Sequence, residues 1–297
     1  MAALGFVGGQ GMSDLITMDD LTNDEILEIL DAAERLLPVA NGDVYAPLLQ
    51  GKVLGNLFFE NSTRTRMSFE SAMKRLGGEV VNLSSVGSSV AKGETLYDTM
   101  QMVDGYSDIA VIRHPRQGAA QYSADAIGIP VLNAGDGAGN HPTQTMLDLF
   151  TIRQAHGSLE GLNVVLVGDL RYGRTTHSLS HALVRFGAKL TLVSPESLRM
   201  PTEIVGDLQS HGSDVVESEN LAGAIADADV IYMTRIQKER FPDEDEYAKV
   251  AGIYKMTADD LAVAKAGMIV MHPLPRVDEI DPSVDSTQHA RYFQQAF

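Results

Sequence analysis

Short apolar runs alternate with segments of helical periodicity along most of the chain. The apolar runs occupy residues 52–59, 79–83, 108–114, 129–134, 162–168, 188–194, 213–218, 229–234 and 267–273. Helical segments separate the early runs, at residues 64–76, 94–105 and 118–127. Strands that alternate with helices favour right-handed β-α-β units, in which neighbouring strands run parallel. The pattern therefore predicts an α/β fold with mostly parallel sheets flanked by helices.

The 297 residues exceed the usual size of one domain, which favours two packed domains. Residues 142–156 begin with Pro142, a favoured first residue of a helix, and carry apolar residues at a helical period. We expect this segment to be a helix that links a first domain, residues 1–141, to a second, residues 157–290. Residues 1–11 are rich in glycine and are expected to form a flexible extension.

Several segments rich in charged, polar and glycine residues lie at the carboxyl ends of the predicted strands. They are "ENSTRTR", "RHPRQG", "NAGDGAGNHPTQ", "GDLRYGRTTH", "TRIQKER" and "HPLPR". Ligands of parallel α/β domains bind beyond the carboxyl ends of the strands. We therefore expect these segments to meet in a cleft between the two domains, which favours an enzyme.

Composition excludes some classes of site. The chain has no cysteine, which rules out disulfides, thiolate catalysis and cysteine-based metal sites and fits a cytoplasmic location. Its formal net charge of −17 argues against general nucleic-acid binding. No apolar run approaches the roughly 20 residues that cross a bilayer. An anionic ligand would need a local basic pocket, so each group of arginines in this acidic chain is informative.

The stretch "FFENSTRTRMSFE", residues 58–70, places hydroxyls and guanidiniums at the start of a predicted helix. Ser62 or Thr63 lies near the N-cap, where backbone N–H groups and the helix dipole favour an anion, and Arg64 adds a donor suited to phosphate. The alternative is a capped helix with exposed arginines. The local pattern favours the two interpretations about equally.

Other candidate residues lie at further strand and helix ends. Arg113 ends a strand, where an unpaired guanidinium is costly to bury without an anion. His141 precedes the linking helix and Gln144 lies in its first turn, after glycines that permit close approach of the backbone to a ligand. The alternatives for the Gly/Ser-rich residues 84–95, which carry Lys92, are a mobile lid that contacts phosphate and an ordinary surface loop, and the surface loop is favoured.

In the second half, Arg174 lies near the start of a helix and suits a carboxylate. Arg235 and Gln237 alternate, so in an extended segment they project to the same side. The nearby glycines do not form the dinucleotide-binding pattern G-x-G-x-x-G. The sequence also lacks a Walker A motif, H-E-x-x-H and G-x-S-x-G, and no His/Asp/Glu grouping has metal-ligand spacing.

Together these segments resemble the carbamoyltransferase family. The motifs that carry the resemblance span roughly residues 52–295 and are "FFENSTRTRMSFE", "SSVAKGET", "RHPRQGAA", "LNAGDGAGNHPTQTMLDLFTI", "VGDLRYGRTTHSL", "YMTRIQKER" and "HPLPRVDEI". Within the family, "HPLPR" favours aspartate as the acceptor, because ornithine-using relatives place a cysteine before the Leu-Pro pair. The resemblance implies transfer of the carbamoyl group of carbamoyl phosphate to the α-amine of L-aspartate. The products would be N-carbamoyl-L-aspartate and phosphate, in de novo pyrimidine biosynthesis.

The resemblance also implies a role for individual residues toward carbamoyl phosphate. The residues that hold its phosphate would be Ser62, Thr63, Arg64 and Thr65. The residues at its carbamoyl end would be Arg113, His141 and Gln144. A neighbouring subunit would add Ser88 and Lys92, which implies a homotrimer with shared active sites.

The aspartate site implied by the resemblance draws mainly on the second domain. Its residues would be Lys92, Arg174, Arg235, Gln237, Leu274 and Pro275. The catalytic residues would be Arg64, Thr65, Arg113 and His141, acting as donors to developing negative charge rather than as nucleophiles. Neither a metal nor an organic cofactor is implied.

Family members usually continue beyond "YFQQA" with a helix that returns to the first domain, so residues 291–297 are expected to begin that segment. A separate regulatory chain, present in some members, is left open. Two other functions are also left open. One is a carbamoyltransferase with a different amino-acid acceptor, and the other is a non-catalytic relative that acts as a scaffold.

Overall fold

The computed structural model describes residues 14–84, 92–137, 139–236, 244–248, 250 and 252–297. It divides into two units, Met1–Met146 and Leu147–Phe297. The division falls within helix α5 (Pro142–His156), the segment predicted to link two domains. Each unit is an α/β structure with its own sheet.

Unit 1 is built on a parallel sheet in the order β2-β1-β3-β4. Its strands are β1 (Val53–Phe58), β2 (Glu79–Ser84), β3 (Ile109–His114) and β4 (Val131–Asp136). The central strand β1 is almost wholly buried, whereas every residue of the edge strand β2 is exposed or half-buried. The carboxyl ends of β1 and β3 are adjacent, since Phe58 pairs with Arg113.

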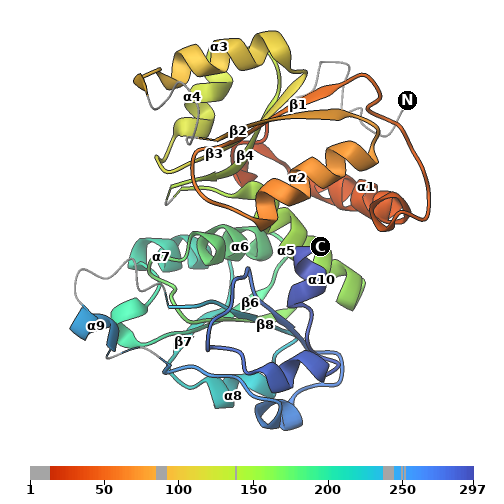
Figure 1. The fold of residues 1–297 in the computed structure, drawn as a ribbon. Coiled ribbons are helices and arrows are strands. Elements are labelled where there is room, and N and C mark those ends of the chain that lie inside the picture. Colours follow the sequence, from red (N-terminus) through yellow and green to blue (C-terminus); the bar gives the residue numbers. More distant parts are fainter. Residues whose placement is uncertain (1–13, 85–91, 138, 237–243, 249, 251) are drawn as a thin grey trace. The chain divides into compact units, whose positions relative to one another are not determined.

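Helices cover both faces of this sheet. They are α1 (Asn23–Asn41), α2 (Arg64–Arg75), α3 (Leu96–Tyr106) and α4 (Ala119–Ala126). Figure 1 shows α3 and α4 on one face and α1 and α2 on the other. Alternating strand residues fill the two resulting cores: Leu57 and Ile112 pack on the α3–α4 side, and Phe58 and Val111 on the α2 side.

Unit 2 repeats this plan with a parallel sheet in the order β7-β6-β5-β8-β9. The strands are β5 (Asn163–Val167), β6 (Lys189–Val193), β7 (Val215–Ser218), β8 (Val230–Met233) and β9 (Ile269–Met271). The helices are α6 (Arg174–Val184), α7 (Thr202–Ser210), α8 (Leu221–Ile225), α9 (Glu244–Ala248) and α10 (Tyr292–Ala296). Short 3-10 helices occur in both units: η1 (Met18–Asp20) in unit 1, and η3 (Glu196–Leu198), η5 (Asp259–Val263) and η6 (Pro282–Ser286) in unit 2.

In unit 2, α6 and α7 lie over one face of the sheet and α8 over the other. The core on the α8 side joins residues of β5, β8 and β9 to Tyr292 of α10, which is fully buried. Gln295 of α10 is also buried, so the last described turn of the chain is packed into unit 2. Among the described helices, none is both long and apolar enough to cross a membrane.

The predicted fold class is confirmed: each predicted strand is present, and every strand pair in both sheets is parallel. The predicted helices at residues 64–76, 94–105, 118–127 and 142–156 are present as α2, α3, α4 and α5. Helix α1 was not among the predictions. Its start is nevertheless marked in the sequence, because Thr22 and Glu25 form a reciprocal capping box.

Candidate active site

The N-terminus of α2 carries the first predicted group. Thr63 is the N-cap residue, but its side chain makes no capping hydrogen bond, and the first turn contains no acidic residue. The positive end of the helix dipole is therefore not offset by a carboxylate of the same turn. Thr63 and Arg64 are exposed, and Ser62 and Thr65 are half-buried. This geometry favours the anion-site interpretation over the capped helix.

A second guanidinium lies close to Arg64. Partial desolvation of the guanidinium and then the positive charge of Arg113 lower the pKa of Arg64, which indicates that the two like charges interact. Arg113 is mostly buried: its Nη1 donates weakly to the carbonyl of Ala134 (3.4 Å), and its Nη2 lies 3.5 Å from Oε1 of Glu60. Within the described residues, Nε of Arg113 and Oε2 of Glu60 are buried without a hydrogen-bond partner. Two neighbouring cations with an unused buried donor suit an anionic ligand.

His141 ends the loop after β4, and Gln144 lies in the first turn of α5. The carbonyl of His141 accepts the amide of Gln144 (3.0 Å), so the backbone of His141 begins the helix. Its ring is buried, and Nδ1 lies 3.3 Å from the hydroxyl of Thr143. The side chain of His141 is thus held beside the first turn of α5.

A buried carboxylate connects the loop of His141 to the loop that follows Arg113. Asp136 accepts the amide of Gly118 on one oxygen (2.8 Å) and the amide of Asn140 on the other (2.7 Å). Gly137, at φ +58°, lets the loops touch, because a Cβ there would lie 2.6 Å from the carbonyl oxygen of Pro115. Asp136 was not among the predicted site residues, although it fixes the segments on both sides of them.

The predicted contributions of a neighbouring subunit fall on the segment before α3. Lys92 is exposed. Ser88 lies outside the described residues.

In unit 2, Arg174 is the first residue of α6, directly after β5 and its loop. The loop is fixed by short contacts: Oδ1 of Asp169 accepts the amide of Tyr172 (3.0 Å), and Nε2 of His177 lies 2.7 Å from the carbonyl oxygen of Leu170. Because a carbonyl only accepts, Nε2 of His177 carries the proton. Gly173 permits the tight turn into α6, since a Cβ there would lie 2.4 Å from the carbonyl oxygen of Asp169.

The end of β8 places Arg235 against the end of β5. Gly168 has φ +114°, and a Cβ at this position would lie 2.3 Å from the carbonyl oxygen of Thr234. The amide and hydroxyl of Thr234 both donate to the carbonyl of Val167, at 2.8 and 2.9 Å. The residue before Arg235 is therefore fixed to the loop that leads to Arg174. Gln237, the predicted partner of Arg235, lies outside the described residues.

Leu274 and Pro275 follow β9. Leu274 has φ +55°, which costs a residue with a Cβ about 1–2 kcal/mol, and its peptide bond to Pro275 is cis. The amide of Leu274 donates to Nδ1 of His272 (2.8 Å), and Nε2 of His272 lies 2.6 Å from Oε1 of Glu279. Positive charge on Arg235 contributes to lowering the pKa of His272, after burial, so the ends of β8 and β9 are near one another.

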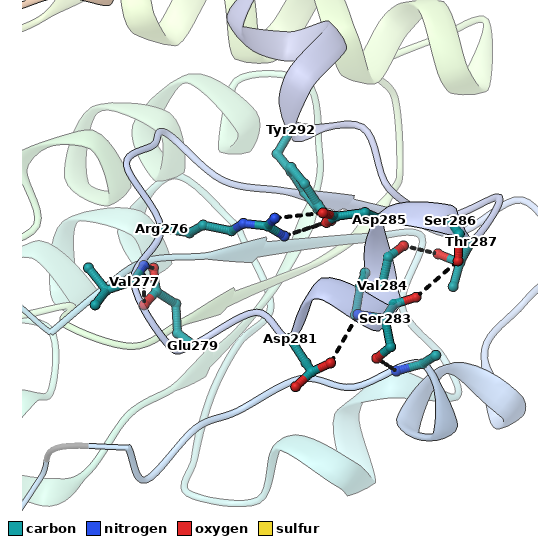
Figure 2. A network of polar contacts seen from close by, with 11 residues as sticks. Arg276, Val277, Glu279, Asp281, Ser283, Val284, Asp285, Ser286, Thr287 and Tyr292 are labelled. Carbon is teal, nitrogen blue, oxygen red and sulfur yellow. Dashed lines mark hydrogen bonds and ion pairs between the residues drawn. The ribbon is translucent and has the colours of Figure 1, made fainter.

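Arg276, the last residue of "HPLPR", is engaged in a structural contact. Figure 2 shows its guanidinium paired through two nitrogens with the carboxylate of Asp285, which also accepts the hydroxyl of Tyr292. The guanidinium lies over the rings of Tyr292 and Phe293, with its central carbon 5.2 and 5.4 Å from their centroids. These contacts anchor the end of the Leu274–Pro275 loop to η6 and α10.

The structure thus groups the predicted residues within each unit. Unit 1 carries the candidates for the donor phosphate and carbamoyl group, and unit 2 carries Arg174, Arg235, Leu274 and Pro275. Sequence reasoning missed Glu60, Asp136, His272 and Glu279, which hold these residues in place. Glu60 could have been noticed as an acidic residue two positions before Ser62 at a strand end, whereas Asp136, the last residue of β4, belongs to no side-chain pattern that marks its role.

An open groove of about 500 Å³ in unit 2 is separate from these residues. It runs along β5, β6 and β7 beside α8, and none of the predicted site residues lines it. In the part of the chain that the structure describes, no group of three or more His, Asp or Glu residues is arranged to hold a metal ion.

Comparison with known proteins assigns the two halves of the chain. Residues 13–154 match the carbamoyl-phosphate-binding domain of aspartate/ornithine carbamoyltransferases, and residues 160–297 match the Asp/Orn-binding domain of the same proteins. The chain belongs to the aspartate/ornithine carbamoyltransferase family. The two matched domains correspond closely to units 1 and 2.

Individual members of the aspartate/ornithine carbamoyltransferase family are similar to this chain in sequence and in structure. The aspartate carbamoyltransferase catalytic subunit of Archaeoglobus fulgidus is 56% identical over 96% of this chain and 95% of its own length. The catalytic subunit of M. jannaschii aspartate transcarbamoylase has a TM-score of 0.90 at 50% identity, covering 96% of this chain and 94% of that one. The Trypanosoma cruzi enzyme, solved with carbamoyl phosphate and aspartate, has a TM-score of 0.90 at 41% identity, covering 96% and 92%.

Proposed function

We propose that this protein is an aspartate carbamoyltransferase catalytic chain. It transfers the carbamoyl group of carbamoyl phosphate to the α-amine of L-aspartate and releases N-carbamoyl-L-aspartate and phosphate. The observation that carries the proposal is the interaction of two guanidiniums, those of Arg64 at the N-terminus of α2 and of Arg113 near the end of β3. Nε of Arg113 is buried without a hydrogen-bond partner among the described residues. The identity to aspartate carbamoyltransferases supports the same acceptor.

The donor site follows from unit 1. The N-terminal turn of α2, with Ser62, Thr63, Arg64 and Thr65, holds the phosphate of carbamoyl phosphate. Arg113, His141 and Gln144 contact the carbamoyl group. Nε of Arg113 loses its desolvation penalty when it meets an oxygen of the substrate.

The acceptor site follows from unit 2. Aspartate carries two carboxylates, and Arg174 and Arg235 provide one guanidinium for each, with Gln237 as a further donor. The backbone of Leu274 and Pro275 lines the same site. Because the two substrates react with one another, the proposal requires both groups of residues to act on one pair of bound substrates.

In the reaction, the deprotonated α-amine attacks the carbamoyl carbon and a new C–N bond forms. Negative charge develops on the carbonyl oxygen, where Thr65, Arg113 and His141 donate hydrogen bonds. The C–O bond to phosphate then breaks, Arg64 stabilises the leaving phosphate, and that phosphate accepts the proton of the amine. Neither a nucleophilic side chain nor a cofactor takes part in these steps.

The proposal includes a homotrimer in which Ser88 and Lys92 of a neighbouring subunit complete each site. Unit 1 exposes large apolar side chains on α2, β2 and α3, which favours contact with other subunits. They are Met67, Val81, Tyr97, Met102 and Tyr106. The proposal leaves open whether a separate regulatory chain binds. A cytoplasmic location fits the absence of cysteine.

Steady-state assays test the activity directly. Product formation is measured with carbamoyl phosphate and either L-aspartate or L-ornithine, and activity is expected with aspartate alone. A higher rate with ornithine would replace the proposed acceptor, and no rate with any amino acid would favour a non-catalytic scaffold. The Arg64→Ala variant serves as a control for contaminating enzyme.

Subunit mixing tests the shared site. Lys92→Ala and Arg64→Ala trimers are each expected to be nearly inactive, and a mixture exchanged under mild denaturant should regain activity. Hybrid trimers contain sites in which Arg64 and the neighbouring Lys92 are both intact. A mixture that stays inactive although mass measurements show hybrid trimers would exclude sharing.

A further inference from the structure

His272 is a buried histidine that the proposed reaction does not use. It is 1% exposed and directly follows β9, two residues before Leu274. Its ring bridges two groups: Nδ1 faces the amide of Leu274 at 2.8 Å, and Nε2 faces Oε1 of Glu279 at 2.6 Å. The ring therefore spans the loop that contains Leu274 and Pro275.

The partners of the ring fix its protonation. A backbone amide can only donate, so Nδ1 must accept, and the proton resides on Nε2 and is donated to Glu279. Burial lowers the pKa of His272 and the positive charges of Arg276 and Arg235 lower it further, while Glu279 raises it. Burial raises the pKa of Glu279, but hydrogen bonds from His272 and backbone amides bring it below its ordinary value. The pair is a neutral imidazole with a carboxylate.

The contact with Leu274 constrains the backbone where the loop is strained. Leu274 has φ +55°, a conformation that favours glycine, and such a residue persists only when its surroundings hold it. The amide of Leu274 bonded to Nδ1 closes a turn of the kind that an asparagine side chain makes with the amide two residues later.

The bridged loop is anchored on both sides. Before it, the amide of His272 donates to Oε1 of Gln295 (2.8 Å), and Nε2 of Gln295 donates to Oδ1 of Asp148 (2.6 Å). The other oxygen of Asp148 accepts the hydroxyl of Tyr232 on β8 (2.9 Å). After the loop, Arg276 is paired with Asp285, as Figure 2 shows. Against these fixed ends, the ring of His272 sets the conformation of the residues between them.

We propose that His272, oriented by Glu279, is a positioning residue for the amino-acid acceptor. It holds the backbone of Leu274 and Pro275 in the conformation that receives aspartate and does not itself contact the substrate. The inference rests on the proposed function, since it assumes that the acceptor binds beside this loop. The part of His272 that acts is the lone pair of Nδ1, rather than its charge.

Three substitutions separate this role from simple packing. His272→Asn retains an acceptor that can reach the amide of Leu274 but not Glu279, whereas His272→Gln can reach Glu279 but is too long to close the turn. His272→Ala removes both contacts. Aspartate saturation curves are measured for each variant at saturating carbamoyl phosphate, together with the Kd of carbamoyl phosphate and the thermal midpoint.

The expected result is a rise in the aspartate KM of about 10-fold or more for His272→Ala and His272→Gln, with a much smaller change for His272→Asn. The Kd of carbamoyl phosphate, a property of unit 1, stays within twofold, and the thermal midpoint shows that the variants are folded. An unchanged aspartate KM in His272→Ala would overturn the proposal. The proposal would also be overturned if the Asn and Gln variants showed equal increases in the aspartate KM that followed the decrease in their thermal midpoints. That result would indicate that His272 acts through packing alone.

The wild-type protein distinguishes failure of the inference from failure of the proposed function. A wild type that uses another amino acid overturns the aspartate assignment, and the same three curves then test His272 with that acceptor. A wild type without any carbamoyltransferase activity overturns both proposals. An active wild type whose Ala variant behaves identically overturns the role of His272 alone.

Discussion

The two units present their candidate ligand groups in different ways. Unit 1 relies on a helix N-terminus and on Arg113, whose buried Nε lacks a hydrogen-bond partner in the described chain. Unit 2 relies on loop backbones held by close approach and local hydrogen bonds, at Gly168 and Leu274. An anion is thus expected to stabilise unit 1 on binding, whereas the acceptor is expected to find a preformed surface in unit 2.

Loss of Arg113 should have the largest effect on activity, because it removes the cation that unit 1 offers to carbamoyl phosphate. We expect Arg113→Ala to lower kcat/KM for carbamoyl phosphate by about 10³-fold. Steady-state kinetics with carbamoyl phosphate as the varied substrate measure the effect.

The matched control is Arg116→Ala, an exposed arginine three residues further along the chain. It makes the same change in net charge and should leave kcat/KM within about twofold. Equal losses in the two variants would show that overall charge, rather than the position of Arg113, governs donor binding.

The backbone of unit 2 can be disturbed at Gly168 without removing any functional group. Gly168→Ala places a Cβ against the carbonyl of Thr234 and should lower the free energy of unfolding by about 3 kcal/mol. It should also raise the aspartate KM, because Arg235 follows Thr234. Denaturant unfolding and acceptor saturation measure the two effects.

Gly187→Ala is the control for backbone strain alone. Gly187 also has a positive φ, +71°, but a Cβ there would meet no atom within 4 Å. We expect a cost of about 1 kcal/mol and an unchanged aspartate KM. Similar behaviour of the two variants would mean that contact with Thr234 is unimportant.

Arg235→Ala tests whether the acceptor arginine acts on binding rather than on chemistry. The expected result is an increase in the aspartate KM of about 100-fold with a smaller change in kcat, and no change in the Kd of carbamoyl phosphate. Arg199→Ala, which removes an exposed arginine paired with Glu219, provides the control. A normal aspartate KM in Arg235→Ala would remove this residue from the acceptor site.

Acidification should have the smallest effect, a loss of folding stability that arises from buried histidines in both units. Burial is the leading cause that lowers the pKa of His114 in unit 1 and of His177 and His272 in unit 2. Their folded pKa lies below the unfolded value of about 6.5, so the unfolded chain binds more protons and stability falls as the pH drops below about 6.5. Each histidine contributes up to about 1 kcal/mol between pH 7 and 5.5.

Thermal melts at pH 7.5, 6.5 and 5.5 measure this loss. The His177→Gln variant should flatten the dependence more than His114→Gln, because His177 is the more deeply buried. Carboxylates with a lowered pKa, such as Asp281 with a pKa of about 2, lose their contribution to stability only at much lower pH. A melting temperature that does not change between pH 7.5 and 5.5 would contradict the histidine assignment.

The sequence predicted the strands well, for a physical reason. Buried parallel strands are continuous apolar runs. The hydroxyls and arginines at the start of α2 suited an anion site and a capped helix about equally by residue type. The conformation of Leu274 could not be predicted, since leucine rarely adopts a positive φ and the bond from its amide to Nδ1 of His272 becomes visible only in the structure. Asp136 was missed because its partners are backbone amides, which leave no trace in side-chain patterns.

The division of the chain inside α5 has a consequence for biosynthesis. Each sheet takes its strands from one continuous half of the sequence, and none of the described strands is exchanged between the two. A ribosome therefore delivers every strand of the first sheet before it begins the second. The amino-terminal half can bury its core while the rest is still being translated, which limits the time that its parallel strands are exposed to aggregation.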